Sequence, residues 1–178
     1  MDLNKIPLAK CYQVLAFFMV INSFGQEQRQ NPNILYENFS KAYREKNAIL
    51  LEELYMQDAV LLNLYDSSGP NSIQGKTAIK NYFSNFFKIA EKNGQELRLT
   101  FKIIRREELE DAVLDNGFYK LTIIDRDKPE IMSHGKLSTV LKWDLGNWKF
   151  MVDANTDTNE IEYRNATTGS IPQPKDMP

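Results

Sequence analysis

The sequence predicts a single α+β domain, with helices in its first half and one antiparallel sheet in its second half. Up to about residue 93, apolar residues recur every three or four positions, which is the period of an amphipathic helix. From Gln95 onward the period changes to two, as in a β-strand with one buried face. Helices followed by a run of strands indicate an α+β domain, whereas a doubly wound parallel sheet would alternate strands with helices.

The first 25 residues are predicted to be a cleavable signal peptide. Two lysines precede an apolar run over residues 12–24, and Ser23 and Gly25 place small residues where a signal peptidase would cut, after Gly25. The run is shorter than the roughly 20 residues that cross a bilayer. A buried N-terminal helix or an uncleaved anchor is the alternative. We therefore expect a periplasmic or secreted bacterial protein without a membrane span after cleavage, beginning with a polar segment over 26–33.

Charge and cysteine content exclude two further classes. Cleavage would remove two lysines and one aspartate from the 22 basic and 24 acidic side chains, which leaves 20 and 23 and a net charge of −3. An acidic chain without a basic cluster is not expected to bind nucleic acid. The sole cysteine, Cys11, lies within the predicted signal peptide, so the domain must be held together by its core and not by disulfides.

Three helices are expected before the sheet. The first follows Pro32, and its apolar face is made by Ile34, Leu35, Phe39, Ala42 and Tyr43. A second, short amphipathic stretch spans residues 50–55. The third runs from Gly75 to an Asn-Gly pair at residues 93–94. A strand over 59–65 precedes the third helix and ends in a loop, 66–71, rich in serine, glycine and proline.

Four strands are expected after residue 95, over 97–103, 112–124, 131–143 and 148–152. Gly117 in the second of them suggests a bulge. On the last strand Trp148, Phe150 and Val152 are expected to share the inner face. The domain is expected to span residues 34–163. The remainder, 164–178, has three prolines among its last seven residues and is expected to be disordered.

The order of these segments resembles a known family. A glycine-led helix follows the loop in the stretch Ile73-Gln-Gly-Lys-Thr-Ala-Ile79, and a Gly-x-Trp-Lys turn in Leu145-Gly-Asn-Trp-Lys149 opens the last strand. This layout is similar to the nuclear transport factor 2-like superfamily, which includes SnoaL-like and ketosteroid-isomerase-like domains. The resemblance covers roughly residues 34–159. It implies three helices packed in a strongly curved sheet, a cystatin-like cone with a pocket, and often a dimer through the sheet.

The resemblance does not carry the chemistry of ketosteroid isomerase. Enzymes of that type use a carboxylate on the first strand as general base and a neutral acid on a later strand as hydrogen-bond donor. The matching positions of this chain hold Asn63 and, within a residue, Thr139. An amide cannot accept a proton at neutral pH, so this isomerase reaction is not expected.

Three titratable side chains are weak candidates for other acid–base chemistry: Asp153, His134 and Asp58. The only histidine, His134, falls on the more polar face of its strand. Asp153 shares parity with Met151, opposite Trp148, and is therefore expected on the outer face of the sheet.

No metal or cofactor is expected. One histidine and no mature cysteine are too few ligands for a structural zinc site. Residues 153–159 begin like a calcium loop, but Thr158 replaces the required glycine and Arg164 replaces the final glutamate.

The expected function is binding of an unknown small apolar or aromatic molecule by an exported domain, without catalysis and as a homodimer through the sheet. The residues expected to line the pocket are Tyr43, Asn63, Tyr119, Thr139 and Trp143. One alternative is an isomerase- or dehydratase-type enzyme that uses Asp153, His134 or Asp58. The other is a protein-interaction module whose sheet face carries Lys136, Ser138, Val140, Lys142 and Met151.

Overall fold

The computed structural model describes residues 30–65 and 69–167. The predicted signal peptide, residues 1–25, and residues 168–178 of the tail expected to be disordered lie outside the described residues. Within the described ranges no helix is both long and apolar enough to cross a membrane.

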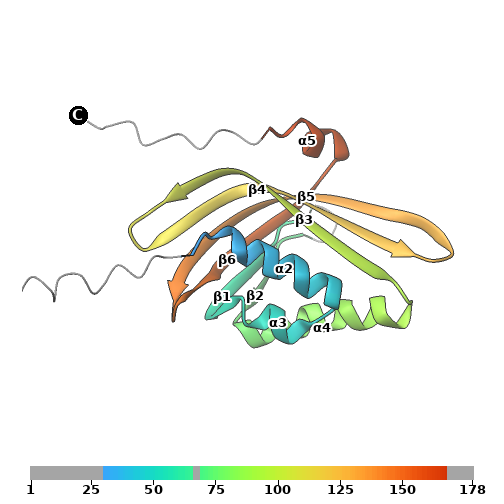
Figure 1. The fold of residues 1–178 in the computed structure, drawn as a ribbon, viewed down its shortest axis with the longest axis horizontal. Helices are drawn as coiled ribbons and strands as arrows, with labels where there is room; N and C mark the ends of the chain where they lie inside the picture. Colours follow the sequence, from blue (N-terminus) through green and yellow to red (C-terminus); the bar gives the residue numbers. More distant parts are fainter. Residues whose placement is uncertain (1–29, 66–68, 168–178) are drawn as a thin grey trace, which may run out of the picture.

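The predicted α+β class is confirmed. Four helices are described: α2 (Asn33–Glu45), α3 (Ala48–Glu52), α4 (Lys76–Lys92) and α5 (Glu160–Asn165). The strands are β1 (Tyr55–Asn63), β2 (Asn71–Gln74), β3 (Glu96–Glu108), β4 (Ala112–Asp125), β5 (Lys128–Asp144) and β6 (Asn147–Thr158). They form one six-stranded sheet in the order β2-β1-β6-β5-β4-β3. Helices α2, α3 and α4 lie on one side of this curved sheet and α5 lies on the other (Figure 1).

The sheet is antiparallel except at one pairing. Strand β1 runs parallel to β6, whereas β1–β2, β3–β4, β4–β5 and β5–β6 are antiparallel. Strands β3 to β6 follow one another through short turns, which enforces antiparallel pairing. Strand β1 is separated from them by α4, and it joins the sheet at the free edge of β6. This parallel pairing was not expected from the sequence.

Several element boundaries differ from those predicted. Helix α3, whose N-terminus is capped by Asn47, ends at Glu52, and strand β1 begins at Tyr55, a residue predicted to end the second helical stretch. Strand β2 begins at the last residue of the predicted loop, 66–71, and continues through three residues for which no strand was predicted. Helix α5 includes Arg164, which the sequence had placed in the tail.

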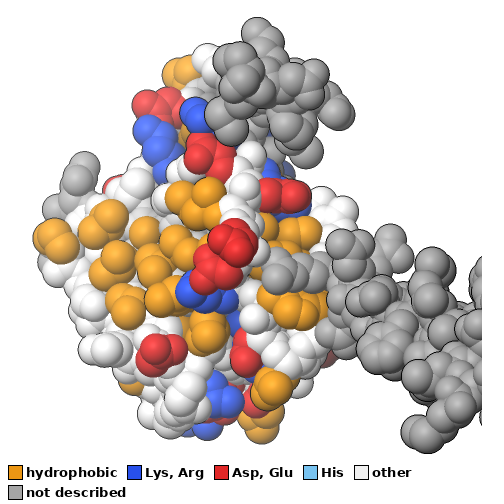
Figure 2. All heavy atoms as spheres, turned by 90° about the vertical axis from the view of Figure 1, so that its left-hand side faces the viewer, with side chains coloured by type: hydrophobic (Ala, Val, Ile, Leu, Met, Phe, Trp, Pro, Cys, Tyr) orange, Lys and Arg blue, Asp and Glu red, His pale blue; other side chains and the backbone are white. Residues whose placement is uncertain are grey.

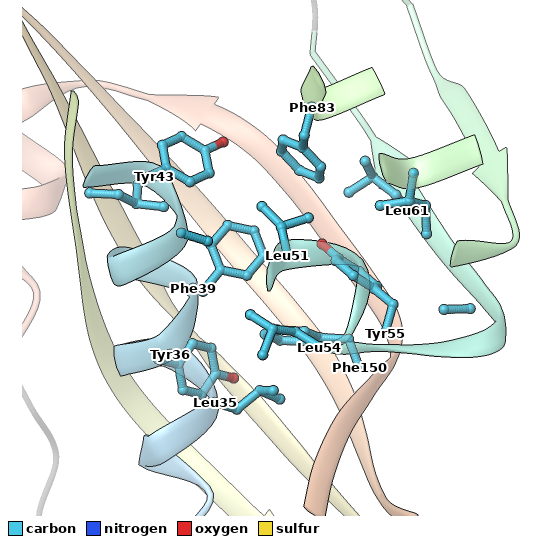
Figure 3. Packing of buried hydrophobic residues seen from close by; sticks show 14 of the residues in the cluster. Leu35, Tyr36, Phe39, Tyr43, Leu51, Leu54, Tyr55, Leu61, Phe83 and Phe150 are labelled. Carbon is cyan, nitrogen blue, oxygen red and sulfur yellow. The ribbon is translucent and has the colours of Figure 1, made fainter. Parts of the chain in front are cut away.

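The core lies between α2, α4 and the concave face of the sheet. The buried face of α2 carries Leu35, Phe39 and Tyr43 against the sheet (Figure 3). The ring of Phe39 stands 5.5 to 6.3 Å, centroid to centroid, from the rings of Tyr43, Tyr55, Phe83, Phe101 and Phe150. Most of these pairs are edge-to-face, the arrangement that aromatic quadrupoles favour.

Not all apolar side chains are in the core. Leu145 in the β5–β6 turn and Ile161 on α5 are among the exposed ones. Seen from the left-hand side of Figure 1, hydrophobic side chains gather over one part of the surface, next to a few acidic and basic ones (Figure 2).

The described strands contain four register shifts, and two of them are β-bulges that change which face the side chains of a strand point to. In β6 the partners of Val140 and Leu141 are Val152 and Phe150, so Met151 is an extra residue. In β3 the extra residue is Ile104, opposite Gly117. The bulge expected at Gly117 therefore lies on the neighbouring strand. A side chain at Gly117 would overlap the backbone carbonyl of Lys102, so the close approach requires glycine.

Candidate functional site

A cavity of about 660 Å³ lies between the helices and the concave face of the sheet. Phenylalanine and tyrosine rings from α2, α4, three strands and the segment after β1 make up the largest group of its lining side chains. The titratable acids among them are Asp153 and Asp157, and His134 lies at the rim. None of the described lining residues is a lysine or an arginine. The cavity is therefore apolar on its walls and acidic at a few points.

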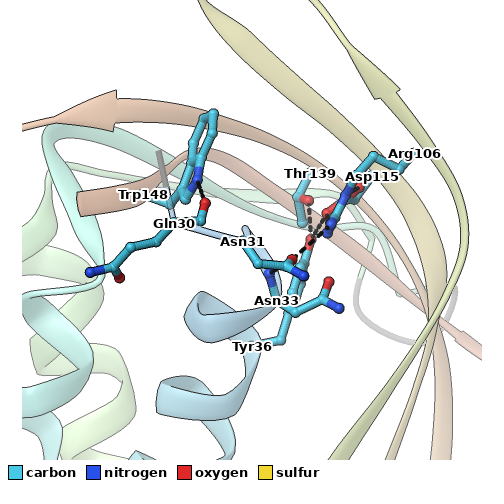
Figure 4. Close-up of polar contacts among 8 residues, drawn as sticks. All are labelled: Gln30, Asn31, Asn33, Tyr36, Arg106, Asp115, Thr139 and Trp148. Carbon is cyan, nitrogen blue, oxygen red and sulfur yellow. Dashed lines mark hydrogen bonds and ion pairs between the residues drawn. The ribbon is translucent and has the colours of Figure 1, made fainter. Parts of the chain in front are cut away.

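Four of the five residues predicted to line a pocket line this cavity: Tyr43, Asn63, Tyr119 and Thr139. Trp143 is not among its lining residues. It is on the inner face, as its parity predicts, but it lies near the β5–β6 turn, where its ring packs 5.3 Å from that of Trp148. The indole nitrogen of Trp148 donates a hydrogen bond of 2.6 Å to the carbonyl of Gln30 (Figure 4).

Asp153 lies on the inner face of the sheet and lines the cavity, which corrects the prediction that it faces outward. The extra residue at Met151 reverses the alternation of β6, so the side chains after it exchange faces. Val152, expected inside, consequently points to the outer face. Parity counted from Trp148 is correct only as far as Phe150.

The carboxyl group of Asp153 has an unusual environment. The buried hydroxyl of Tyr55 donates a hydrogen bond of 2.6 Å to its Oδ2. Oδ1 has no hydrogen-bond partner among the residues that the structure describes. Burial raises the pKa of Asp153 to about 6, although the bond from Tyr55 acts in the opposite direction. This carboxyl can therefore change protonation state close to neutral pH.

A second buried carboxylate, Asp115, lies in the same row of the sheet. Thr139 is the register partner of both Asp153 and Asp115. Arg106 clamps Asp115 through Nε and Nη2, each 2.7 Å from a carboxylate oxygen (Figure 4). The hydroxyl of Tyr36 donates to Asp115 at 2.9 Å and lies 2.7 Å from that of Thr139. Because Tyr36 gives its proton to Asp115, Thr139 must donate to Tyr36 and retains its acceptor lone pairs.

Sequence reasoning missed this network, and neither Arg106 nor Asp115 was among the predicted site residues. The available signal was Asp115, since alternation along the predicted strand places it on the face of Tyr119 and Leu121. An acid on an apolar face calls for a buried partner.

Two tyrosines that line the cavity, Tyr65 and Tyr119, contact each other through their hydroxyl groups. The hydroxyls of Tyr65 and Tyr119 are 3.3 Å apart. The ring of Tyr119 lies directly over Gly135, and a side chain at Gly135 would overlap it. His134 is next in sequence, and its ring is 4.8 Å from that of Tyr163 on α5. Burial raises the pKa of both Tyr65 and Tyr119, so their hydroxyls stay protonated at neutral pH.

Other polar groups near the cavity are amides. Asn155 donates to the Oδ1 of Asn63 at 3.1 Å, and the Oδ1 of Asn155 is buried without a partner among the described residues. Asp58, the third acid–base candidate, is exposed on β1 and is not among the lining residues. In the described part of the chain no group of three or more histidine, cysteine, aspartate or glutamate side chains could hold a metal ion.

Comparison with known proteins identifies the fold. No protein-family model and no curated protein sequence matches the chain. Among solved structures, a ketosteroid isomerase-like protein from Erwinia carotovora atroseptica is similar with a TM-score of 0.55 and 11% identity, covering 76% of this chain and 99% of that one. An uncharacterised protein with a cystatin-like fold from Caulobacter vibrioides gives 0.55 and 18% identity over 75% and 91% of the two chains.

A third similar structure contains a bound compound. It is a protein from Catenulispora acidiphila in complex with S-DNPA, with a TM-score of 0.59 and 15% identity over 70% of this chain and 89% of that one. At such identities the likeness shows the fold alone. The expected cystatin-like fold is thereby confirmed.

Proposed function

We propose that this chain, whose fold is that of the nuclear transport factor 2-like superfamily, binds a small apolar or aromatic molecule in its cavity. The supporting observation is the cavity itself, whose volume of about 660 Å³ falls in the usual range of roughly 300–1,000 Å³ for ligand sites. Aromatic walls with a few polar groups are also typical of such sites. The polar groups that would orient the ligand are those of Asp153, Thr139, Asn63 and Asn155.

The experiment is a titration with 2-naphthol, a neutral bicyclic aromatic probe, followed by protein NMR. Leu121 lines the cavity from β4, and Leu121→Trp would narrow it with a bulkier side chain. Leu109 is an exposed leucine in the β3–β4 turn that does not line the cavity, so Leu109→Trp is the matched control. We expect full binding to the wild type and to the control, and clearly weaker binding to Leu121→Trp. Equal binding by both variants would show that the probe occupies another surface.

We propose a second function, proton transfer to or from the bound molecule by Asp153. This rests on the position of Asp153 in the cavity and on its pKa near 6, which suits a general acid or base at neutral pH. The ionised carboxylate would remove a proton α to a ketone, and the enolate would then take a proton back. In D₂O the protein should therefore introduce deuterium at the α carbon of 2-tetralone.

Deuterium incorporation is followed by NMR of the ketone. Asp153→Asn should lose the activity, and Asp58→Asn, which makes the same charge change at an exposed position, should keep it. If Asp153→Asn exchanges protons as fast as the wild type, Asp153 is not the base.

We also propose that the protein is a homodimer through the outer face of the sheet. One row across four strands of this face is entirely aliphatic and half-buried: Val60, Val152, Val140 and Leu114. A hollow of about 400 Å³ lies on the same face. Sedimentation should show a dimer that Val140→Glu dissociates and that Leu145→Glu, in the exposed turn, leaves intact. A wild-type monomer at micromolar concentration would contradict the proposal.

Export remains a proposal from the sequence. The two lysines, the apolar run and the small residues up to Gly25 support a cleavable signal peptide. Expression of the full chain in a bacterium should yield a periplasmic or secreted protein whose N-terminal sequence starts at Gln26. An uncleaved Met1 terminus would contradict cleavage.

A further inference from the structure

The charge balance of the cavity indicates which class of ligand it takes. Asp115 on β4 and Asp153 on β6 lie in the same row of the sheet with β5 between them, but their surroundings differ. Asp115 is fully buried and is neutralised by Arg106 through two bonds of 2.7 Å. Among the ion pairs of the described residues none involves Asp153. Its neighbour is the neutral hydroxyl of Tyr55, which occupies only Oδ2.

A carboxylate in an apolar site without a counter-charge is costly unless something outside the chain completes it. The surface that Asp153 retains faces the cavity, since the residue lines it, and Oδ1 is the atom left without a partner. The nearest lysine or arginine in its row of the sheet, Arg106, is engaged by Asp115. The missing partner of Asp153 is therefore a hydrogen-bond donor, and a positively charged donor fits best.

The aromatic residues that line the cavity with Asp153 also favour a positively charged ligand. Aromatic rings have negative faces, which attract organic cations and repel anions. The rings that line the cavity with Asp153 include those of Tyr36, Tyr43, Phe150 and Tyr119. These rings and the carboxyl of Asp153 therefore face the same enclosed space. The second acid of the lining, Asp157, adds to the negative potential.

We propose that the ligand is an organic cation, an amine on an apolar or aromatic body, whose ammonium group donates to the free Oδ1 of Asp153 while its body lies among the aromatic rings. This rests on the proposed binding function and narrows it to one chemical class. Thr139 lies on the adjacent strand and retains its acceptor lone pairs, so its hydroxyl oxygen can accept a second hydrogen bond from the ammonium group.

The test compares three probes with the same body and different head groups: naphthylethylamine, a cation at neutral pH; naphthylethanol, which is neutral; and naphthylpropionate, an anion. Affinities are measured by isothermal titration at neutral pH and low salt. The wild type should bind the amine about tenfold or more tightly than the alcohol, and the anion most weakly. This comparison needs no variant, so it does not depend on any variant folding.

Two variants locate the charge that is recognised. Asp153→Asn keeps the size of the side chain and an acceptor for Tyr55, and it should lower amine affinity about tenfold while changing alcohol affinity less than about twofold. Asp58→Asn removes the same charge outside the cavity and should leave both affinities unchanged.

The outcomes separate the two proposals. If the amine and the alcohol bind equally, and Leu121→Trp, which narrows the cavity, weakens the binding of both, the cavity binds ligands but the cation proposal is wrong. Preference for the anion would also overturn it. If none of the three probes binds, and 2-naphthol does not bind either, both the ligand class and the binding function fail.

Discussion

The Asp153→Asn substitution should make the protein more stable at neutral pH, although it alters a group at the centre of the proposed site. The pKa of Asp153 is about 6 in the folded protein instead of 3.8. One pKa unit corresponds to about 1.4 kcal/mol, so the ionised carboxylate destabilises the native state by roughly 3 kcal/mol. Asparagine removes this cost but loses the charge-assisted bond from Tyr55. We expect a net gain of about 1 to 3 kcal/mol.

The gain should depend on pH in a defined direction. Because the folded pKa is above the unfolded one, the native state binds more protons than the unfolded chain between about pH 4 and pH 6. The contribution of Asp153 to stability therefore falls as the pH rises through this window, and its cost is fully present above about pH 7. Below about pH 4 the carboxyl is protonated in both states and the cost vanishes.

The assay is urea unfolding of the wild type and of Asp153→Asn at several pH values from 4 to 7.5, with Asp58→Asn as the control for loss of a negative charge. The difference in unfolding free energy between Asp153→Asn and wild type should be close to zero at pH 4 and should reach its full value at pH 7.5. Other titrating groups cancel in this difference. A variant that is less stable than wild type at pH 7.5 would refute an uncompensated carboxylate in the cavity.

Other changes test the rest of the site. Arg106→Leu leaves Asp115 buried without its cation and should cost about 3 to 5 kcal/mol in urea unfolding; replacing both by leucine should recover most of the loss, and equal instability of the single and double variants would contradict this. Tyr36→Phe removes one donor to Asp115 and should cost about 1 to 3 kcal/mol, so an unchanged unfolding midpoint would mean that the hydroxyl contributes little. Gly135→Ala should displace the ring of Tyr119 and weaken 2-naphthol binding several-fold with little loss of secondary structure by circular dichroism; unaltered affinity would show that this ring does not shape the cavity.

The period of the apolar residues was sufficient to predict helices α2 and α4 and the long hairpins. Helix α2 and helix α4 each bury the face that their spacing predicts, and strands β3 to β6 follow the predicted alternation over most of their length. These elements carry their signal locally. The edge strand β2 has a single half-buried side chain, Ile73, which is too little to give a period, and the parallel pairing of β1 with β6 depends on where α4 returns the chain.

The candidate site was predicted less well because it depends on relations between strands. The parity of Asp153 was inverted by one extra residue at Met151, which is apolar like its neighbours and leaves no mark in the sequence. Trp143 was assigned to the correct face of the sheet, but the alternation of residues does not tell how far along the strand the cavity extends. Arg106 and Asp115 come together only because β3 and β4 pair in one register.

The bulge at Met151 divides β6 into one part that packs in the core and a second part that lines the cavity. Ahead of it, Trp148 and Phe150 anchor the strand in the hydrophobic interior, and beyond it Asp153 and Asn155 furnish the cavity with polar groups. Deletion of Met151 would exchange the two faces of the second part of the strand. Both polar side chains would move to the convex surface, and the residues that alternate with them would face the cavity. The chemistry available to a bound molecule is thus set by the length of a strand as much as by the identity of its residues.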